Sequence, residues 1–146
     1  GKVTRAEFSK IAVLAFDIKS DVYSNFNDIR ADAWYAKYVG ILAHYGIVTG
    51  YDGFFRPDDY ITREDAAVII DRIFKLKNIN LSNGDKQFED SQNVSDYAKE
   101  SVAILANAKI INGDGIRFYP KNLISRGETA VLICNCDNAI EGGSEE

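Results

Sequence analysis

Thr4-Arg5-Ala6-Glu7 is the first of three copies of one pattern in this chain. The later copies are Thr62-Arg63-Glu64-Asp65 and Ser125-Arg126-Gly127-Glu128. Their arginines are 58 (63 − 5) and 63 (126 − 63) residues apart. A repeat of this length is one supersecondary unit that must stack on its neighbours to bury its apolar face. The sequence therefore predicts a repeat protein in which every copy ends in the same charged helix start.

Most of the sequence between these motifs repeats as well, at a shift of 62 or 63 residues. Phe26-Asn27-Asp28 matches Phe88-Glu89-Asp90, and Trp34 matches Tyr97. A glycine-rich link at 50–57 matches the one at 113–120, and we expect Phe55 and Phe118 within them to fill the core. The repeats predict one domain at 1–140, made of the end of a first repeat (1–18), a second repeat (26–76) and a third (88–138), with a linker or tail at 141–146.

Apolar periodicity predicts that the chain is all-α. One kind of helix follows each motif, as in the stripe Ala66, Ile69, Ile70, Ile73 and Phe74. The other kind is expected from the stripe Trp34, Tyr38, Ile41, Leu42 and Tyr45, and from its counterpart beginning at Tyr97. Gly46 would end such a helix in the left-handed conformation, and Lys109 takes the same position in the next copy. Only the last helix of the first repeat is present, and because the sequence shows no signal peptide and no Met, Gly1 is expected to begin a fragment or a processed chain.

Composition narrows the classes of function. The chain has 146 residues, 46% of them hydrophobic and 27% charged, which indicates a folded domain. Its net charge of −5 argues against nucleic-acid binding, and no apolar run is long enough to insert into a membrane. A single histidine, His44, leaves no Ser–His or metal–His constellation, so neither catalysis nor a metal is expected. Cys136 completes an apolar stripe and is predicted to be a core residue rather than half of a disulfide with Cys134.

The hydroxyl and the acid of each motif match a capping box, in which both side chains bond to backbone N–H groups at the helix start. Capping accounts for Thr4, Glu7, Thr62, Asp65, Ser125 and Glu128. It leaves the arginine unexplained, because the helix macrodipole disfavours a cation there by a few tenths to about 1 kcal/mol. Two interpretations stay open: the arginine binds a carboxylate or another anion, or it pairs with Asp28 or Asp90 of the next repeat. For Trp34 and Tyr97, the residues alone favour a core position over a sugar-binding face.

The run Phe26-Asn27-Asp28, Trp34-Tyr35, Gly46, Asp52-Gly53, Phe55, Pro57 and Thr62-Arg63-Glu64 resembles an S-layer homology (SLH) repeat. The resemblance spans nearly the whole chain, as the end of one repeat and two further repeats. It implies helical repeats in a pseudo-threefold bundle that attaches an extracellular protein noncovalently to secondary polysaccharides of the bacterial cell wall. A location at the wall or S-layer, a polysaccharide partner, no cofactor and no catalysis are therefore implied.

The resemblance also implies a ligand-binding set. In the family, the motif's arginine binds a negatively charged sugar in a groove between repeats, commonly N-acetylmannosamine with a pyruvate ketal. Carried over residue by residue, the set is Arg5, Asp28, Trp34, Arg63, Asp90, Tyr97 and Arg126. Asp28 and Trp34 are expected to face Arg5, and Asp90 and Tyr97 to face Arg63. Arg126 lacks such partners in this chain, so a missing segment or a partner chain would have to complete its groove.

Two other functions stay open on the sequence. One is a helical protein-interaction scaffold whose arginines bind acidic partners. The other is a piece of an extracellular enzyme whose catalysis lies in a different domain, and this is compatible with wall anchoring.

Overall fold

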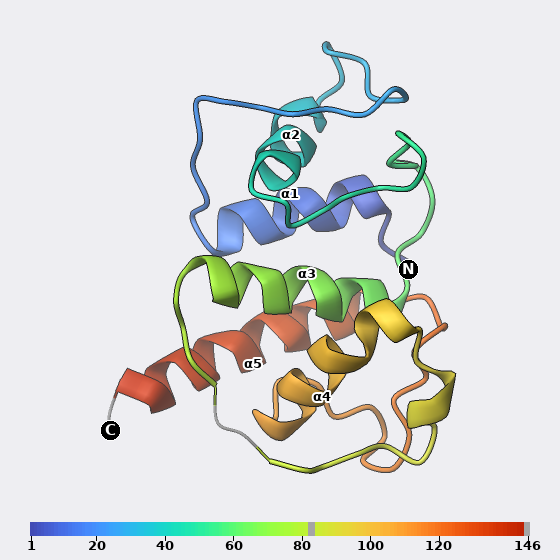
Figure 1. The fold of residues 1–146 in the computed structure, drawn as a ribbon, viewed down its shortest axis with the longest axis vertical. Coiled ribbons are helices and arrows are strands. Elements are labelled where there is room, and N and C mark those ends of the chain that lie inside the picture. The colour runs from blue at the N-terminus through green and yellow to red at the C-terminus, as the bar shows by residue number, and fades with distance from the viewer. Residues whose placement is uncertain (82–83, 145–146) are drawn as a thin grey trace. The chain divides into compact units, whose positions relative to one another are not determined.

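The computed structural model describes residues 1–81 and 84–144, and their regular structure is helical (Figure 1). Five α-helices and two 3-10 helices occur in these ranges: α1 (Arg5–Ala15), α2 (Ala36–His44), α3 (Arg63–Leu76), η1 (Ser91–Asn93), η2 (Asp96–Ala98), α4 (Lys99–Asn107) and α5 (Arg126–Ser144). The β-type pairing within the described ranges consists of isolated bridges and no strand. The prediction of an all-α chain is confirmed, whereas the pseudo-threefold arrangement stays a prediction.

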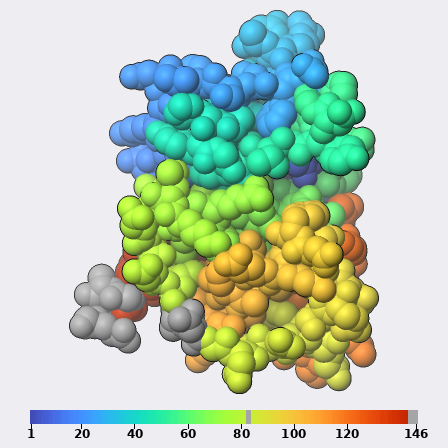
Figure 2. All heavy atoms as spheres, in the orientation of Figure 1, coloured from blue at the N-terminus to red at the C-terminus, as the bar shows by residue number. Residues whose placement is uncertain are grey.

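The chain forms two compact units, which are described separately. The first unit comprises Lys2–Ile61 and packs α1 against α2. The second unit comprises Gly1 and the chain from Thr62 onward, and it packs α3 against α4 and η2. In the space-filling view, α4 and the segment before it lie at the surface beside α3 (Figure 2). Each unit therefore combines the helix that ends one repeat with the front of the next, and a site shared by two repeats lies inside one unit.

Backbone hydrogen bonds join each helix start to the segment that follows the glycine-rich link. The Arg5 N–H donates to the Asp59 carbonyl at 2.8 Å, and the Arg63 N–H donates to the Asn122 carbonyl at the same distance. These N–H groups belong to the first turn, where no partner exists within the helix. The segment after the link thereby accepts hydrogen bonds from first-turn N–H groups of the helix, and the link is held next to the motif's arginine.

Side chains of the motif cap the helices. The Thr4 hydroxyl accepts from the Glu7 N–H at 3.0 Å, and Glu7 accepts from the Thr4 N–H at 2.9 Å. Ser125 and Glu128 exchange the same two bonds, each at 3.0 Å. At α3, the Thr62 hydroxyl accepts from the Asp65 N–H at 3.3 Å. These bonds satisfy first-turn N–H groups, as in a capping box.

The core includes the two phenylalanines of the links, as predicted. Phe55 and Phe118 are each 1% exposed, and they stack on Phe26 and Phe88 with ring centroids 5.4 Å apart. Cys136 is fully buried and Cys134 is exposed, both as free thiols. Burial raises the pKa of the Cys136 thiol to about 12, so it stays neutral and behaves as an apolar side chain. The prediction that Cys136 is a core residue is confirmed.

The prediction made from residues alone that Trp34 and Tyr97 belong to the core is wrong. They are 56% and 60% exposed, because α2 and α4 begin only after them, at Ala36 and Lys99. Helical periodicity does not extend to residues that precede the helix. The buried face of α2 is instead formed by Ala36, Val39, Gly40, Ile41 and Leu42.

The C-terminal helix extends beyond its expected end. α5 reaches Ser144, so residues 141–144, expected to be linker or tail, are helical. Residues 145–146 of that tail lie outside the described residues, as do residues 82–83 in the connector between the second and third repeats.

Candidate carbohydrate-binding sites

Arg5 reaches from the start of α1 to the glycine-rich link of the first unit. Its Nε donates to the Phe55 carbonyl at 2.9 Å, and its guanidinium carbon lies 4.9 Å from the centre of the Phe55 ring. A cation over an aromatic face is attracted by the ring quadrupole. The Arg5 side chain is therefore held in a fixed position at the edge of the link.

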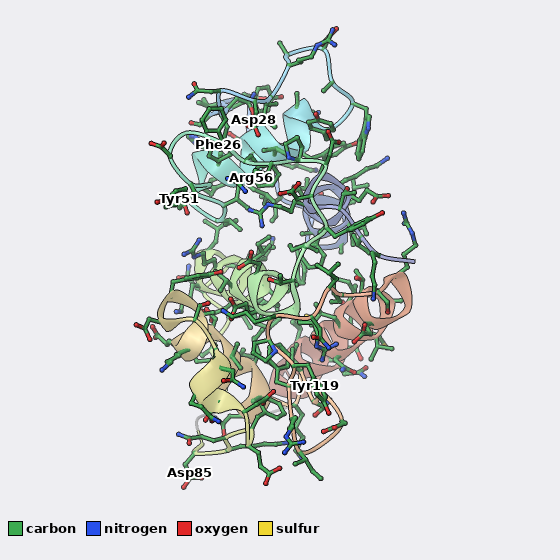
Figure 3. The ribbon with its side chains drawn as sticks, turned by 90° about the vertical axis from the view of Figure 1, so that its right-hand side faces the viewer. Phe26, Asp28, Tyr51, Arg56, Asp85 and Tyr119 are labelled. Atoms are coloured by element: carbon green, nitrogen blue, oxygen red, sulfur yellow. The ribbon has the colours of Figure 1, made fainter. Side chains whose placement is uncertain are left out.

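Asp28 binds the same link through backbone N–H groups. Its carboxylate accepts from the Phe55 N–H at 2.9 Å and from the Arg56 N–H at 2.7 Å (Figure 3). Arg56 has a φ of 62°, a left-handed conformation that a residue with a Cβ adopts only at a cost. Two charge-assisted bonds to the carboxylate hold the chain in that conformation. Both side chains thus bind the backbone of Phe55: Arg5 binds its carbonyl and Asp28 binds its N–H.

The second unit repeats this construction. Arg63 Nε donates to the Phe118 carbonyl at 2.8 Å, with the guanidinium carbon 5.0 Å from the ring centre. Asp90 accepts from the Phe118 and Tyr119 N–H groups at 2.9 and 2.8 Å, and Tyr119 has a φ of 59°. Burial lowers the pKa of Arg63, and the negative charge of Asp90 opposes this shift. The structure brings Arg5 and Arg63, each with the acid of the following repeat, to one link; whether these residues bind a ligand stays a prediction.

Arg63 also pairs with the acid of the third motif. One of its terminal nitrogens donates to the Glu128 carboxylate, and the Arg63 side chain is only 12% exposed. The Glu128 carboxylate therefore both accepts from the Ser125 N–H at the start of α5 and balances the charge of Arg63.

The aromatic residues of the two sites lie at the surface in different surroundings. Trp34 contacts Tyr35 edge to face at 5.2 Å, and Lys10 from α1 places its Nζ 5.6 Å from the Trp34 ring centre. The Tyr97 hydroxyl instead donates its one proton to Asp65 at 2.5 Å, and its oxygen lies 3.2 Å from the Glu64 carboxylate. Burial and these carboxylates raise the pKa of Tyr97, so its phenol remains protonated and acts as a donor.

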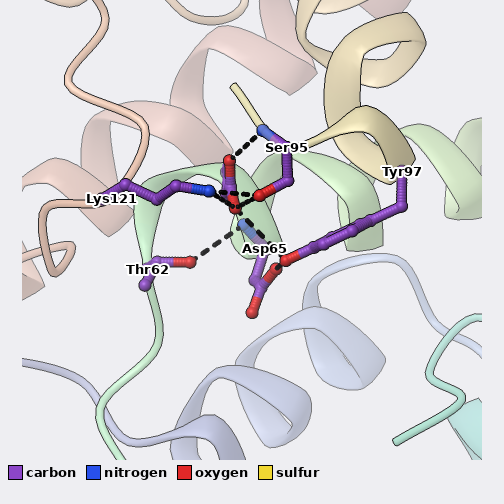
Figure 4. Close-up of polar contacts among 6 residues, drawn as sticks. Thr62, Asp65, Ser95, Tyr97 and Lys121 are labelled. Atoms are coloured by element: carbon purple, nitrogen blue, oxygen red, sulfur yellow. Dashed lines mark hydrogen bonds and ion pairs between the residues drawn. The ribbon is translucent and has the colours of Figure 1, made fainter. Parts of the chain in front are cut away.

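Glu64 forms a buried polar network that the sequence did not reveal. Its carboxylate accepts from the Ser95 N–H at 2.9 Å, the Ser95 hydroxyl at 2.7 Å and the Lys121 ammonium at 2.9 Å (Figure 4). Burial alone would raise the pKa of Glu64, but the bonds from Ser95 and Lys121 outweigh it and hold that pKa below its usual value. The sequence hinted at this network only through Glu64, which stands where the first motif has Ala6. Its donors, Ser95 and Lys121, lie in distant segments of the chain and could not be found from the motif.

Comparison with known proteins assigns the chain to a family. Residues 25–67 and 87–130, more than half of the chain, match the model of the S-layer homology domain. The chain belongs to the S-layer homology domain family.

The similar proteins are much longer than this SLH chain. An exoglucanase of Acetivibrio thermocellus is 36% identical over 90% of the chain, which spans 12% of that protein. An amylopullulanase of Thermoanaerobacterium thermosulfurigenes is 35% identical over 90% of the chain, and the chain spans 7% of it. A surface-layer 125 kDa protein of Lysinibacillus sphaericus is 31% identical over 90% of the chain, and the chain spans 11% of it. The SLH chain thus corresponds to a small part of each of these proteins, of which two are named as enzymes and one as a surface-layer protein.

Family membership sets the general role and location. SLH domains are the non-catalytic anchoring modules of S-layer and cell surface proteins, so the expected location outside the cell, at the wall, is confirmed. The enzymes among the relatives have most of their length outside the matched region. In the part of the chain that the structure describes, no helix is both long and apolar enough to cross a membrane.

The third SLH motif begins α5. The Arg126 N–H donates to the Gly1 carbonyl at 2.8 Å, the same kind of bond that Arg5 and Arg63 make to Asp59 and Asn122. The Arg126 residue is exposed at the start of α5. Its role in binding stays a prediction.

Proposed function

We propose that this SLH domain anchors its parent protein noncovalently to a secondary cell-wall polysaccharide, with N-acetylmannosamine carrying a pyruvate ketal as the bound sugar. The observation that carries the proposal is the repeated construction in which a positioned arginine binds the glycine-rich link of the following repeat, and that repeat also carries an exposed aromatic residue. In the first unit these residues are Arg5 and Trp34. A fixed guanidinium suits a carboxylate, and an exposed ring suits the apolar face of a sugar.

Each residue of the set has a separate task in this proposal. The motif arginines, Arg5 first among them and Arg63 and Arg126 at the corresponding positions, attract the ketal carboxylate. Trp34 and Tyr97 pack on the sugar ring. Asp28 and Asp90 act as positioning residues, because each of their carboxylates is bound by two backbone N–H groups of a link. Charge-assisted bonds of the arginine type are worth about 1.5–3 kcal/mol each, so a few of them suffice for reversible anchoring.

Cosedimentation with protein-free cell-wall sacculi tests the role of the arginines. The double variant Arg5→Ala/Arg63→Ala is expected to stay in the supernatant under conditions in which the wild-type domain pellets. A matched control, Lys37→Ala/Lys77→Ala, removes the same two positive charges from exposed positions and should pellet like the wild type. Far-UV circular dichroism of both variants checks that the helices persist. Undiminished pelleting of a folded arginine variant would contradict the proposal and favour a protein-interaction scaffold.

A further inference from the structure

The second unit holds a pocket outside the candidate sugar-binding residues. The pocket has a volume of about 340 Å³ and lies between α4 and the segment that runs from Lys86 to Val94. Such a volume falls within the range of small-molecule sites, which begins at about 300 Å³. The described residues that line the pocket all fall between Lys86 and Ala106, so no motif arginine is among them. One continuous stretch of chain therefore builds this pocket.

In the first unit, the corresponding segment and helix bind each other directly. The Ser24 N–H donates to the Gly40 carbonyl of α2 at 3.1 Å. A Cβ added at Gly40 would lie only 2.9 Å from the Cβ of Tyr23, which is closer than real Cβ atoms approach another heavy atom. Because glycine has no side chain, the segment before Phe26 can lie directly on the helix.

In the second unit, the side chain of Asn107 separates the same two segments. In the repeat alignment Lys86 corresponds to Ser24 (86 − 24 = 62), and Ala103 corresponds to Gly40 (103 − 40 = 63). The Lys86 N–H donates to the Asn107 side-chain oxygen at 2.9 Å, and the Asn107 side-chain nitrogen donates to the Ala103 carbonyl at 2.8 Å. One amide group thus stands between an N–H and a C=O whose counterparts in the first unit bond to each other. The Asn107 amide thereby holds the segment away from α4 and keeps the pocket open.

The pocket combines a buried apolar wall with a positive rim. Phe88 and Val102 line it and are 4% and 5% exposed. Lys86 and Lys99 line it from exposed positions, and the Lys86 Nζ lies 5.7 Å from the centre of the Phe88 ring. Among the described residues that line the pocket, none is acidic. Lys99 pairs with Asp96 at the surface at 3.4 Å, and because such exposed pairs contribute little, its ammonium group is able to turn to a ligand.

We propose that this pocket binds a small amphiphilic anion, a molecule with one carboxylate and an apolar chain. The apolar chain replaces water at Phe88 and Val102, and the carboxylate pairs with the ammonium groups of Lys86 and Lys99. The pocket shares no lining residue with the proposed sugar-binding set, so this inference can fail without affecting the proposed function.

Nuclear magnetic resonance of the unaltered domain tests the inference, with hexanoate as the probe. The backbone amides of Phe88, Val102 and Ala103 are expected to shift, and the shifts should saturate. Hexan-1-ol has the same chain without the charge and should bind about tenfold more weakly, because it cannot pair with either ammonium group. No shift of these amides, or equal affinities for the two probes, would overturn the inference.

Two variants test the two parts of the pocket separately. Lys86→Gln/Lys99→Gln should weaken hexanoate binding about tenfold and leave hexan-1-ol binding unchanged. Lys37→Gln/Lys77→Gln is the matched control, because it removes two exposed charges elsewhere and should change neither affinity. Ala103→Leu enlarges an exposed residue of the pocket wall and should abolish binding of both probes while the circular dichroism spectrum is retained. Hexanoate binding that is unchanged in either folded pocket variant would overturn the inference.

Discussion

At the scale of single residues, the repeated arginines and acids have a structural role as well as a proposed role in binding. Asp28 and Asp90 each hold a link residue in the left-handed conformation, and Arg5 and Arg63 bind the carbonyl of the adjacent phenylalanine. The sequence left open whether the arginine binds an anion or pairs with the next repeat's acid. The structure shows a third arrangement, in which arginine and acid bind the C=O and N–H of one shared residue. Sequence reasoning could not find it because each phenylalanine is bound by an arginine 50 or 55 residues away and by an acid 27 or 28 residues away.

Removal of the Asp90 carboxylate should destabilise the second unit. The variant Asp90→Ala leaves the N–H groups of Phe118 and Tyr119 without their acceptor, and a buried unsatisfied donor costs about 1–3 kcal/mol. Urea denaturation followed by circular dichroism measures the loss. Asp28→Ala is the matched comparison and should cost less, because Asp28 is only half-buried and water can reach the freed groups. An unchanged midpoint for Asp90→Ala would refute the structural role of this acid.

The Glu64 network should make stability depend on acid pH. Because the pKa of folded Glu64 lies below its ordinary value of 4.5, the unfolded chain binds the proton more readily. The stabilisation from this group is present above that value and is lost as the pH falls through the folded pKa. Melting temperatures between pH 3 and 7 should therefore fall less steeply at the acid end for Glu64→Gln than for the wild type. Parallel curves for the two proteins would show that the network does not hold the ionised form.

At the scale of helices, the sequence predicted where helices begin, but it predicted only in part which residues form their buried faces. Capping residues act on their own turn, so Thr4 and Thr62 marked the beginnings of α1 and α3 correctly. The apolar stripe of α2 included Trp34 because helical spacing was extended two residues before the helix begins at Ala36. Which aromatic residue is buried depends on packing across the unit, and spacing along one segment does not contain that information.

The end of α4 carries a backbone strain that a single substitution should relieve. Lys109 has a φ of 61°, in the left-handed region that Gly46 occupies at the end of α2 with a φ of 71°. The variant Lys109→Gly should stabilise the domain by about 0.5–1 kcal/mol, reduced by the greater freedom of glycine in the unfolded chain. Gly46→Ala is the reverse test and should destabilise, although no atom lies within 4 Å of the added Cβ. Both changes can be measured as shifts of the urea midpoint, and a destabilised Lys109→Gly would contradict the assignment of strain.

At the scale of the whole molecule, the compact units do not coincide with the sequence repeats. Each unit joins the last helix of one repeat to the front of the next, so an arginine from one repeat meets the link of its successor. The repeat pattern and the helical class were predictable because they depend on periodicity along the chain. The polar network of Glu64 was not, because Glu64, Ser95 and Lys121 meet only in the folded second unit.

The central claim, that this domain holds its protein to the wall through an anionic polysaccharide, is tested most directly by its affinity for protein-free sacculi before and after the polysaccharide is extracted. We predict saturable binding to intact sacculi, its loss after extraction, and an equally strong loss when only the pyruvate is removed. Unchanged affinity for extracted sacculi would contradict the account.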